Sequence, residues 1–291
     1  MVPPSIEVGS LLPMIDSLMQ EFTKSEKKVA DLVSKQPQQI IYSSITDLGE
    51  IAGVGDTTII RFCRKLGFKG YQGFKMALAQ ELSAGNSQSS TALNEEILDT
   101  DPTEVVIQKL QNISVSALQE TVSLLKKDDV VRAVEIIKKS NSIHFYGVGT
   151  SGVTALDAML KFMRIGLNVC CYSDGHMMAM DASLRGKMDT VVGISYSGST
   201  KDTVEALRLA KKAGANTICI THHVRSPITQ YADVILLNGS REGPLQGGAL
   251  ATKIAQLLVI DIIYTELFRS NRDVAARNRK KTGEAIEEKL Y

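Results

Sequence analysis

The chain has 291 residues, and its 33 Lys and Arg residues nearly balance its 32 Asp and Glu residues. At about 100 to 200 residues per domain, this length predicts two domains and excludes a miniprotein held together by disulfides. The near-zero net charge excludes a basic field over the whole molecule, so any surface that binds nucleic acid has to be local.

Three features of the sequence predict a cytoplasmic protein. The longest apolar run, 254–264, is broken by Gln256 and Asp261, so we expect no membrane span. The first 14 residues lack a basic segment followed by an apolar one, which predicts no signal peptide. The four cysteines lie in apolar stretches without C-x-x-C spacing, as is typical of reduced thiols. The histidines show no ligand spacing with carboxylates or thiolates, and we expect no metal.

Residues 1–83 predict an all-α domain. Apolar residues recur there at helical spacing, and strand-like runs are scarce. Thr23 and Glu26 form a capping-box pattern, in which each side chain covers backbone amides at a helix start. We therefore expect a helix that begins directly after Thr23.

Residues 46–67 predict a helix-turn-helix motif. Gly53 suits a turn with positive φ, and the apolar residues around it can fill the wedge between two helices. The second helix, expected over 56–66, corresponds to a recognition helix in the major groove of DNA. We interpret Asp56 as the cap of this helix. The candidate DNA contacts are Thr57, Thr58, Arg61, Arg64, Lys65 and Lys69, the first five on its expected exposed face.

Basic charge is concentrated in and after this second helix. Between Thr57 and Met76 the chain has five basic residues and no acidic one, in a domain that balances nine basic against nine acidic residues. The five are Arg61, Arg64, Lys65, Lys69 and Lys75. This concentration indicates a DNA-binding face. A small helical bundle with a solvated basic face is the alternative interpretation.

A stretch without large apolar residues, 84–91, predicts a linker, which we extend to 84–95. The second domain is then expected over 96–291. Helices are predicted at 102–125 and 128–139, followed by five short apolar strands at 142–146, 168–172, 190–195, 217–221 and 234–237. Further helices are predicted between and after the strands, at 153–165, 178–184, 200–213 and 248–268. Short apolar strands alternating with helices indicate a doubly wound five-stranded parallel sheet. The fold class is thus α followed by α/β.

The loop after the first strand carries a G-x-G-x-x-G pattern at 147–152. This pattern between a strand and a helix is typical of dinucleotide-binding sites. Asp174 lies about 20 residues further on, where a ribose-binding carboxylate is found in such proteins. A NAD-binding protein therefore stays an open alternative.

The loop after the third strand, 195–200, favours a different ligand. Its Ser and Thr hydroxyls and backbone amides lie at the start of a helix, an arrangement suited to a compact phosphate monoester. Ser151 in the first loop is expected to point into the same crevice. The two loops together predict a phosphorylated small molecule as ligand, and an ordinary Ser-rich turn is the structural alternative.

These motifs together resemble the RpiR-type bacterial transcriptional regulators, which join an N-terminal helix-turn-helix domain to a sugar isomerase (SIS) domain that senses phosphosugars. The resemblance rests on residues 25–30, 61–71, 147–152, 195–200 and 254–261. It implies that Ser151, Ser195, Ser197 and Thr200 hold the ligand's phosphate. The other residues expected at this site are Gly149, Gly198 and Ser199 in the same loops, and His176 and Glu242 near the sugar hydroxyls.

The chain departs from the family pattern at two glycines. Gly55 takes the place of a usual Ser cap, at a cost of a few tenths of a kcal/mol. Gly49 replaces a usual Ala, which we expect to loosen its helix by roughly 1 kcal/mol. Neither departure removes the motif.

The resemblance implies a DNA-binding transcriptional regulator whose SIS domain senses a phosphorylated sugar and modulates operator binding. Its expected partners are a double-stranded DNA operator, a phosphosugar effector and further copies of itself, as a homodimer or homotetramer. The helices at 102–125 and 248–268 are the expected contacts between copies. We expect no enzymatic activity, no cofactor and no membrane. The alternatives are a sugar-phosphate isomerase, with Glu242 or His176 as the general base, and a NAD-responsive redox sensor on DNA.

Overall fold

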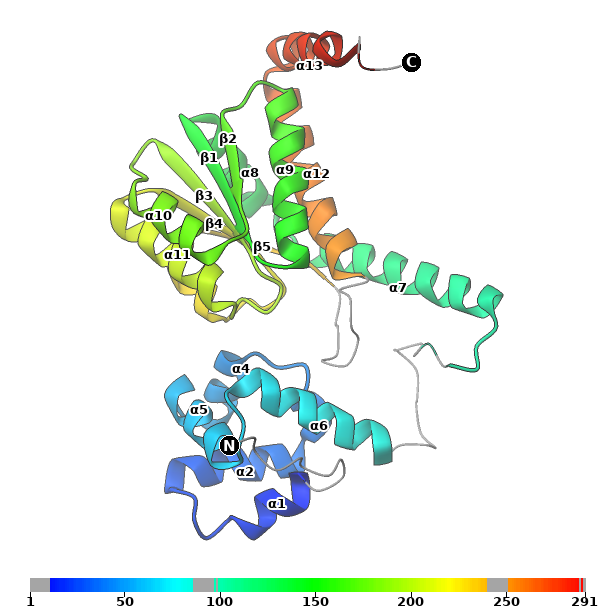
Figure 1. The fold of residues 1–291 in the computed structure, drawn as a ribbon, viewed down its shortest axis with the longest axis vertical. Coiled ribbons are helices and arrows are strands. Elements are labelled where there is room, and N and C mark those ends of the chain that lie inside the picture. The colour runs from blue at the N-terminus through cyan, green and yellow to red at the C-terminus, as the bar shows by residue number, and fades with distance from the viewer. Residues whose placement is uncertain (1–10, 86–96, 98, 240–250, 288, 290–291) are drawn as a thin grey trace. The chain divides into compact units, whose positions relative to one another are not determined.

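The computed structural model describes residues 11–85, 97, 99–239, 251–287 and 289 (Figure 1). By its internal contacts the chain divides into two units, the first holding the described residues up to Ile113 and the second the described residues from Ser114 onward. The division falls within α7 (Thr103–Leu124), and each unit is described by itself. No helix in the described ranges is long and apolar enough to cross a membrane.

The N-terminal unit is helical, as predicted. Its helices before α7 are α1 (Leu11–Ser17), α2 (Lys24–Lys35), α3 (Pro37–Ile40), α4 (Ile45–Ala52), α5 (Asp56–Lys65) and α6 (Tyr71–Gly85). α2 begins directly after Thr23, and the expected capping box is present: Thr23 N donates to Glu26 Oε2 at 2.8 Å, and Glu26 N donates to Thr23 Oγ1 at 3.4 Å. α6 continues two residues into the expected linker, and the rest of that linker, 86–95, lies outside the described residues.

The helix-turn-helix motif is formed by α4, a short turn and α5. Gly53 ends α4 with φ 63°, in the left-handed region that a residue with a side chain rarely adopts. The wedge between the helices is filled as expected: Ile59 and Phe62 are fully buried, and Val54 packs against the same core. The Phe62 ring lies 5.1 Å from that of Phe22 and 5.6 Å from that of Phe74.

The interpretation of Asp56 as the helix cap is wrong. The capping residue is Gly55, which has no side chain to cap the helix, and Asp56 is already the first residue of α5. Its side chain instead accepts a hydrogen bond from Thr46 Oγ1 at 3.4 Å. Asp56 therefore connects α5 to the start of α4.

The expected effect of Gly49 also needs correction. A Cβ built at this position comes within 2.8 Å of the backbone oxygen of Val54, because the turn after α4 folds back over the helix. Val54 N donates to Gly49 O at 2.8 Å and holds this close approach. Gly49 therefore lets the turn pass over α4, and it is not only a weak point of the helix.

We expect Gly49→Ala to lower the free energy of unfolding, although alanine is the better helix former. The gain in helix propensity is about 1 kcal/mol, whereas the backbone of the turn has to move to admit the methyl group. The matched control is Gly73→Ala in α6, where a Cβ meets only the Phe68 side chain at 3.8 Å. Urea denaturation should show stabilisation for Gly73→Ala alone. Equal stabilisation by both substitutions would contradict the inference that the turn after α4 leaves no room for a side chain at position 49.

The C-terminal unit is a five-stranded parallel sheet with helices on both faces. Its strands are β1 (Ser142–Gly147), β2 (Val169–Tyr172), β3 (Asp189–Ile194), β4 (Asn216–Thr221) and β5 (Val234–Leu237). The helices are α8 (Lys127–Lys138), α9 (Thr150–Arg164), α10 (Gly175–Ser183), α11 (Lys201–Ala213), the 3-10 turn η1 (Pro227–Tyr231), α12 (Thr252–Ser270) and α13 (Arg272–Glu287). The predicted doubly wound fold is confirmed, with strand order β2-β1-β3-β4-β5.

Alternation along the strands sends side chains into two separate cores. Ile143 and Phe145 of β1 join the core under α8, α9 and α12, whereas Tyr146 joins the core under α10 and α11 (Figure 1). Each strand is thereby covered on both faces, which explains its nearly continuous apolar sequence. The apolar residues of α12, such as Val259 and Ile263, are buried in the first core. The expectation that α12 also contacts another copy of the chain stays a prediction, because Leu257, Leu258 and Ile262 on the same helix are only half-buried.

Candidate functional site

The two predicted ligand loops lie next to each other at the carboxyl ends of the strands. Gly147 at the end of β1 is paired with Ile194 at the end of β3, so the loops that follow these strands start side by side. β1 has β2 on one side and β3 on the other, which makes this edge the point where the direction of winding changes. Open α/β sheets bind ligands in the crevice at such a point.

The hydroxyls of the second loop are held by the loop itself. Ser195 is 2% exposed, and its hydroxyl is hydrogen-bonded to that of Thr200 at 3.0 Å. Ser197 Oγ accepts from Ser199 N at 3.2 Å, and Ser199 Oγ donates to Ser197 O at the same distance. Thr200 precedes α11 without capping it through its side chain. The loop thus gathers hydroxyls at the positive end of a helix, where an anion is favoured.

Gly198 gives this loop its shape. Its φ is 61°, and a Cβ at this position would lie 2.0 Å from Ser226 Oγ. Gly198 N donates to Ser195 O at 3.1 Å, and Ile228 N donates to Gly198 O at 2.9 Å. The backbone therefore turns tightly between Ser195 and η1, and only glycine fits there.

The first loop presents Gly149 and Ser151 at the start of α9. Gly149 is the exposed N-terminal capping residue of α9 and has no side chain that could cap the helix. Ser151 is 8% exposed, and its Oγ accepts from Gln256 Nε2 at 3.2 Å. Gln256, itself 1% exposed on α12, also accepts from Thr154 Oγ1 at 3.0 Å. The polar residue that interrupts the apolar run of α12 thus positions a predicted site residue.

Replacing Gln256 by Met keeps the length of the side chain but removes both hydrogen bonds. Because Ser151 and Thr154 then lose a buried partner, we expect the free energy of unfolding to fall by about 1 to 3 kcal/mol. Urea denaturation measures this loss. The matched control is Gln108→Met on α7, where the side chain is exposed and a change within about 0.5 kcal/mol is expected. Similar losses for both variants would contradict a specific role for Gln256.

The remaining predicted ligand residues are placed less completely. His176 is exposed in the first turn of α10, whereas Glu242 lies outside the described residues. Asp174, the residue that kept the NAD alternative open, caps α10: its Oδ1 accepts from Met177 N at 3.0 Å. The feature that suggested a ribose contact therefore has a local role in starting a helix.

An aromatic cluster beside the second loop was not predicted. The Tyr196 ring is stacked on His222 with centroids 5.2 Å apart, and His223 lies 5.0 Å from His222. His222 N also donates to Tyr196 O at 3.0 Å. The signal for this cluster was available, because the two histidines directly follow the fourth strand and the carboxyl ends of parallel strands meet at one edge.

A buried polar network ties α10 to β1. His144 lies with Nδ1 2.6 Å from the Asp181 carboxylate and Nε2 2.8 Å from Ser142 Oγ. Tyr146 Oη donates to the same Asp181 oxygen at 2.5 Å. Burial lowers the pKa of His144 below its ordinary value, although Asp181 acts in the opposite direction. This network fixes the helix that carries His176 onto the sheet.

The structure distinguishes among the candidate DNA contacts. Thr57, Arg61, Arg64 and Lys69 are exposed, in agreement with the prediction. Thr58 is only 9% exposed, because it lies on the side of α5 that faces the core, and the prediction that it lies on the exposed face of the helix is wrong.

Two members of the basic run have structural partners. Lys65 Nζ lies 2.7 Å from Glu26 Oε2, and although burial raises the pKa of Glu26, this ammonium holds it below its usual value. Lys75 is 8% exposed and donates to Ser43 O at 2.9 Å, and burial lowers its pKa to about 8. The basic face on and after α5 thus consists mainly of Arg61, Arg64 and Lys69.

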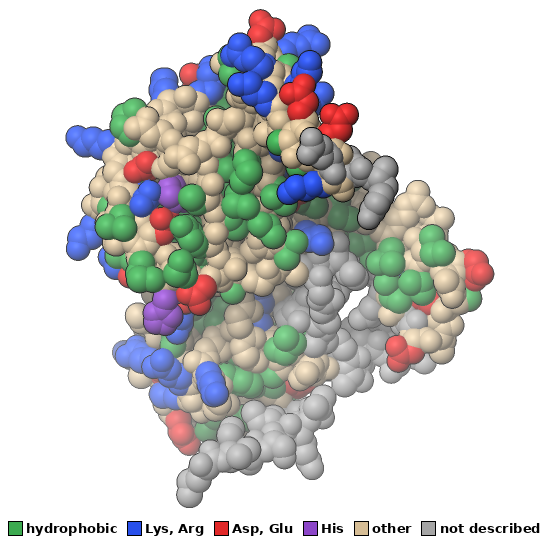
Figure 2. Space-filling model, turned by 45° about the horizontal axis from the view of Figure 1, so that its top comes forward, with side chains coloured by type: hydrophobic (Ala, Val, Ile, Leu, Met, Phe, Trp, Pro, Cys, Tyr) green, Lys and Arg blue, Asp and Glu red, His purple; other side chains and the backbone are tan. Residues whose placement is uncertain are grey.

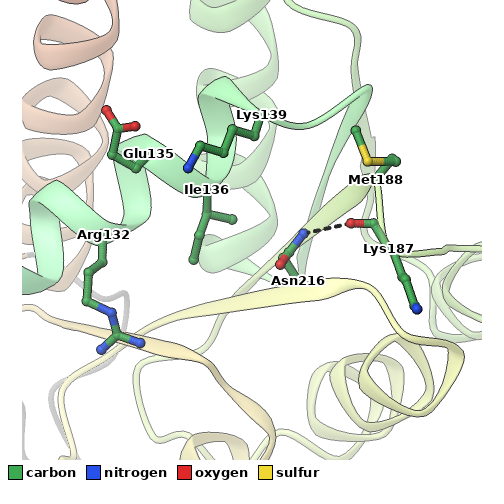
Figure 3. A pocket seen from close by; sticks show the side chains of 7 residues that line it. All are labelled: Arg132, Glu135, Ile136, Lys139, Lys187, Met188 and Asn216. Atoms are coloured by element: carbon green, nitrogen blue, oxygen red, sulfur yellow. Dashed lines mark hydrogen bonds between the residues drawn. The ribbon is translucent and has the colours of Figure 1, made fainter.

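A separate hollow of about 680 Å³ lies at the amino ends of the strands, away from the two ligand loops (Figure 3). It is lined from α8 and from the residues that lead into β3 and β4, where Asn216 Nδ2 donates to Lys187 O at 3.1 Å. The hollow is therefore distinct from the two ligand loops. Within the described ranges, no group of three or more His, Cys, Asp or Glu side chains could hold a metal ion.

Comparisons with known proteins identify both halves of the chain. The family model "Helix-turn-helix domain, rpiR family" matches residues 9–85, and the SIS domain model matches residues 136–266. An HTH-type transcriptional regulator of Haemophilus influenzae is 41% identical over 94% of this chain and 95% of its own length. The HTH-type transcriptional regulator RpiR of Escherichia coli is 31% identical over 95% of this chain and 92% of its own.

A solved structure agrees with these matches over almost the full length. The NanR protein of Vibrio vulnificus, complexed with ManNAc-6P, has a TM-score of 0.85 and 29% identity, covering 97% of this chain and all of its own. The helical unit with its glycine turn and the doubly wound sheet with its paired loops are thus those of one known family. The chain belongs to the RpiR family of HTH-type transcriptional regulators.

Proposed function

We propose that this protein binds an operator in duplex DNA through α5 and that a phosphorylated sugar, bound by the SIS domain, modulates this binding. The observation that carries the proposal is the hydroxyl-lined loop 195–200 beside Ser151, at the helix starts of α9 and α11. A phosphate monoester matches such a site in size and charge. The complex of NanR with ManNAc-6P supports the same class of ligand.

The proposed contacts follow from this arrangement. Thr57, Arg61, Arg64 and Lys69 contact DNA, and Lys65 contributes where its ion pair with Glu26 allows. The phosphate is held by Ser151, Ser195, Ser197 and Thr200, and Gly149, Gly198 and Ser199 complete the two loops around it. His176 and Glu242 recognise sugar hydroxyls. The protein acts in the cytoplasm. It is a homodimer or homotetramer, because one helix-turn-helix reads only a few base pairs and two copies are needed for a longer operator.

We further propose that the SIS domain binds its ligand without converting it. Aldose-ketose isomerisation requires a general base held against the substrate carbon, a role open only to His176 or Glu242 among the proposed residues. The relatives that match over nearly their whole length are transcriptional regulators. Incubation with sugar phosphates should therefore yield no isomer.

The experiment that tests the proposed function measures coupling between the two ligands. A duplex is first selected from random DNA by the full-length protein, and a panel of sugar phosphates, including ManNAc-6P, is screened by calorimetry. The affinity for the selected duplex is then measured at constant salt with and without the bound sugar phosphate. We expect a change of about 5- to 150-fold, and the same factor in sugar-phosphate affinity when DNA is present.

Three outcomes would contradict parts of this proposal. Unchanged DNA affinity, with sugar-phosphate binding confirmed, would show that the SIS domain does not regulate DNA binding. Binding of NADH in place of a sugar phosphate would favour the redox-sensor alternative. Isomer formation at enzymatic rates, lost in Glu242→Gln, would assign the protein to the isomerases.

A further inference from the structure

Lys75 of α6 is a lysine buried where the chain enters the helix-turn-helix motif. Figure 2 shows Lys and Arg side chains projecting from the surface, whereas only 8% of Lys75 is exposed. Its ammonium donates to Ser43 O at 2.9 Å and lies 5.5 Å from the centre of the Tyr71 ring, one turn earlier on the same helix. Among the described residues, its hydrogen-bond acceptor is this neutral carbonyl and not a carboxylate.

Ser43 directly precedes the residue that caps α4. Ser44 forms this cap: Ser44 N donates to Asp47 Oδ2, and Asp47 N donates to Ser44 Oγ, both at 3.0 Å. The buried Tyr71 Oη lies 3.2 Å from the same Ser43 oxygen and 3.3 Å from Ile40 O at the end of α3. α6 therefore holds the entry into α4 with two donors, one of them charged.

The orientation of α4 in turn sets that of the recognition helix α5. Val54 N donates to Gly49 O at 2.8 Å in the turn between them, and Thr46 Oγ1 donates to Asp56 at 3.4 Å. In helix-turn-helix proteins the first helix crosses the DNA backbone and the second lies in the major groove, so the two helices have to meet DNA at a fixed angle. A small rotation at the start of α4 therefore displaces the base contacts of α5.

A gain in stability does not explain a lysine at this position. Burial lowers the pKa of Lys75 to about 8, although Asp47 acts in the opposite direction. The folded domain thus disfavours the charged form, because an ammonium loses hydration when it is buried. A methionine of similar length fills the same space without this cost, and Tyr71 still binds the Ser43 oxygen. The role of the ammonium therefore has to lie in what it holds in place.

We propose that Lys75 is a positioning residue for operator recognition: its ammonium fixes the Ser43 carbonyl and thereby the angle at which α4 and α5 meet DNA. The inference rests on the proposed DNA binding through α5. It adds a residue that contacts neither a base nor a phosphate. In the basic run after α5, Lys75 thus acts through the protein, whereas Arg61 and Arg64 meet DNA.

The test replaces Lys75 by methionine, which removes the donor and the charge but keeps the length of the side chain. The affinity of the full-length protein is measured for the duplex selected from random DNA and for an unrelated duplex of the same length. We expect the affinity for the selected duplex to fall at least about 5-fold, as for the loss of one base contact, and the affinity for the unrelated duplex to stay the same. Urea denaturation should show no loss in the free energy of unfolding.

A second variant separates the hold on α4 from the positive charge. Tyr71→Phe removes the other donor to Ser43 O and leaves the charge of the domain unchanged. It should lower the preference for the selected duplex in the same direction as Lys75→Met. The matched control is Lys35→Met, which removes an exposed lysine at the end of α2 and should leave the ratio of the two affinities unchanged.

The pH dependence of DNA recognition gives a readout that a purely structural role does not move. Above about pH 8 the folded domain loses the Lys75 proton, which the unfolded chain keeps up to about pH 10.4. Because the unfolded state then binds more protons, this group makes the free energy of unfolding rise with pH between about 8 and 10. The preference of the wild type for the selected duplex should instead fall from about pH 7 to 9, and in Lys75→Met it should stay constant.

The other titratable groups around Lys75 do not produce this change. They are Asp47 on α4, Cys63 on α5 and Tyr71 on α6. Burial raises the pKa of Cys63 to about 12 and raises the pKa of Tyr71 further, so both stay protonated up to pH 9. Asp47 is a carboxylate, whose ordinary pKa lies about four units below the range measured.

Three outcomes for Lys75→Met would overturn the proposal. The first is an unchanged affinity for the selected duplex. The second is an equal loss for both duplexes with a shallower salt slope, which would make Lys75 a phosphate contact. The third is a loss of affinity that accompanies a lower free energy of unfolding. A wild type that does not distinguish the two duplexes would instead refute DNA recognition itself, and this inference with it.

Discussion

Replacing Arg61 and Arg64 by alanine is expected to remove most of the affinity of the protein for its operator. Both side chains are exposed on α5, one turn apart, so they lie on the same side of the helix. An arginine that reads a base in the major groove contributes about 1 to 3 kcal/mol, and one that binds phosphate adds to the salt dependence. DNA affinity measured at several salt concentrations should fall, with a shallower salt slope.

The matched control for this variant is Lys24→Ala/Lys35→Ala. It removes the same number of positive charges from the same unit, at exposed positions on α2. If these positive charges attract DNA only in a general way, the two double variants should lose similar DNA affinity. If α5 is the recognition helix, the α5 variant should lose much more DNA affinity than the α2 variant. Equal affinities for the two double variants would refute the assignment of α5. Lys65 is left unchanged, because replacing it would leave the buried Glu26 carboxylate without its ion-pair partner.

Ser197→Ala is expected to weaken binding of the sugar phosphate by about 1.5 to 3 kcal/mol, or roughly 10- to 150-fold, through loss of one hydrogen bond to a dianion. The substitution also removes the acceptor of the Ser199 amide and so loosens the loop. Calorimetry with the sugar phosphate measures the loss. The dephosphorylated sugar should bind more weakly still to the wild type.

Ser183→Ala serves as the control, because this exposed serine on α10 donates only to Met180 O. It should leave the affinity for the sugar phosphate unchanged. If sugar and sugar phosphate bind the wild type equally, the hydroxyl loop does not hold a phosphate, whatever the effect of Ser197→Ala. DNA binding without effector should be the same in both serine variants.

Most of the architecture followed from local patterns in the sequence. The capping box at Thr23, the glycine turn at Gly53 and the short apolar strands each depend on residues close together in the chain. The two ligand loops were predicted to share one edge because parallel strands end at the same edge, and the pairing of Gly147 with Ile194 confirms this. These features need no knowledge of which helix faces which.

The tertiary structure decided what depends on distant partners. Periodicity could not tell that Thr58 and Lys75 are buried, because the buried side of each helix is set by the helices that pack on it. The 2.8 Å approach of Val54 O to a Cβ at Gly49 depends on the path of the turn.

Gln256 illustrates the same limit. Gln256 looked like an interruption of an apolar run, and only the contact of α12 with α9 makes it the partner of Ser151. The sequence by itself therefore determined the elements and their class, through local periodicity and turn chemistry. Which side chains are buried, paired or left in water was decided by the packing of elements far apart in the chain.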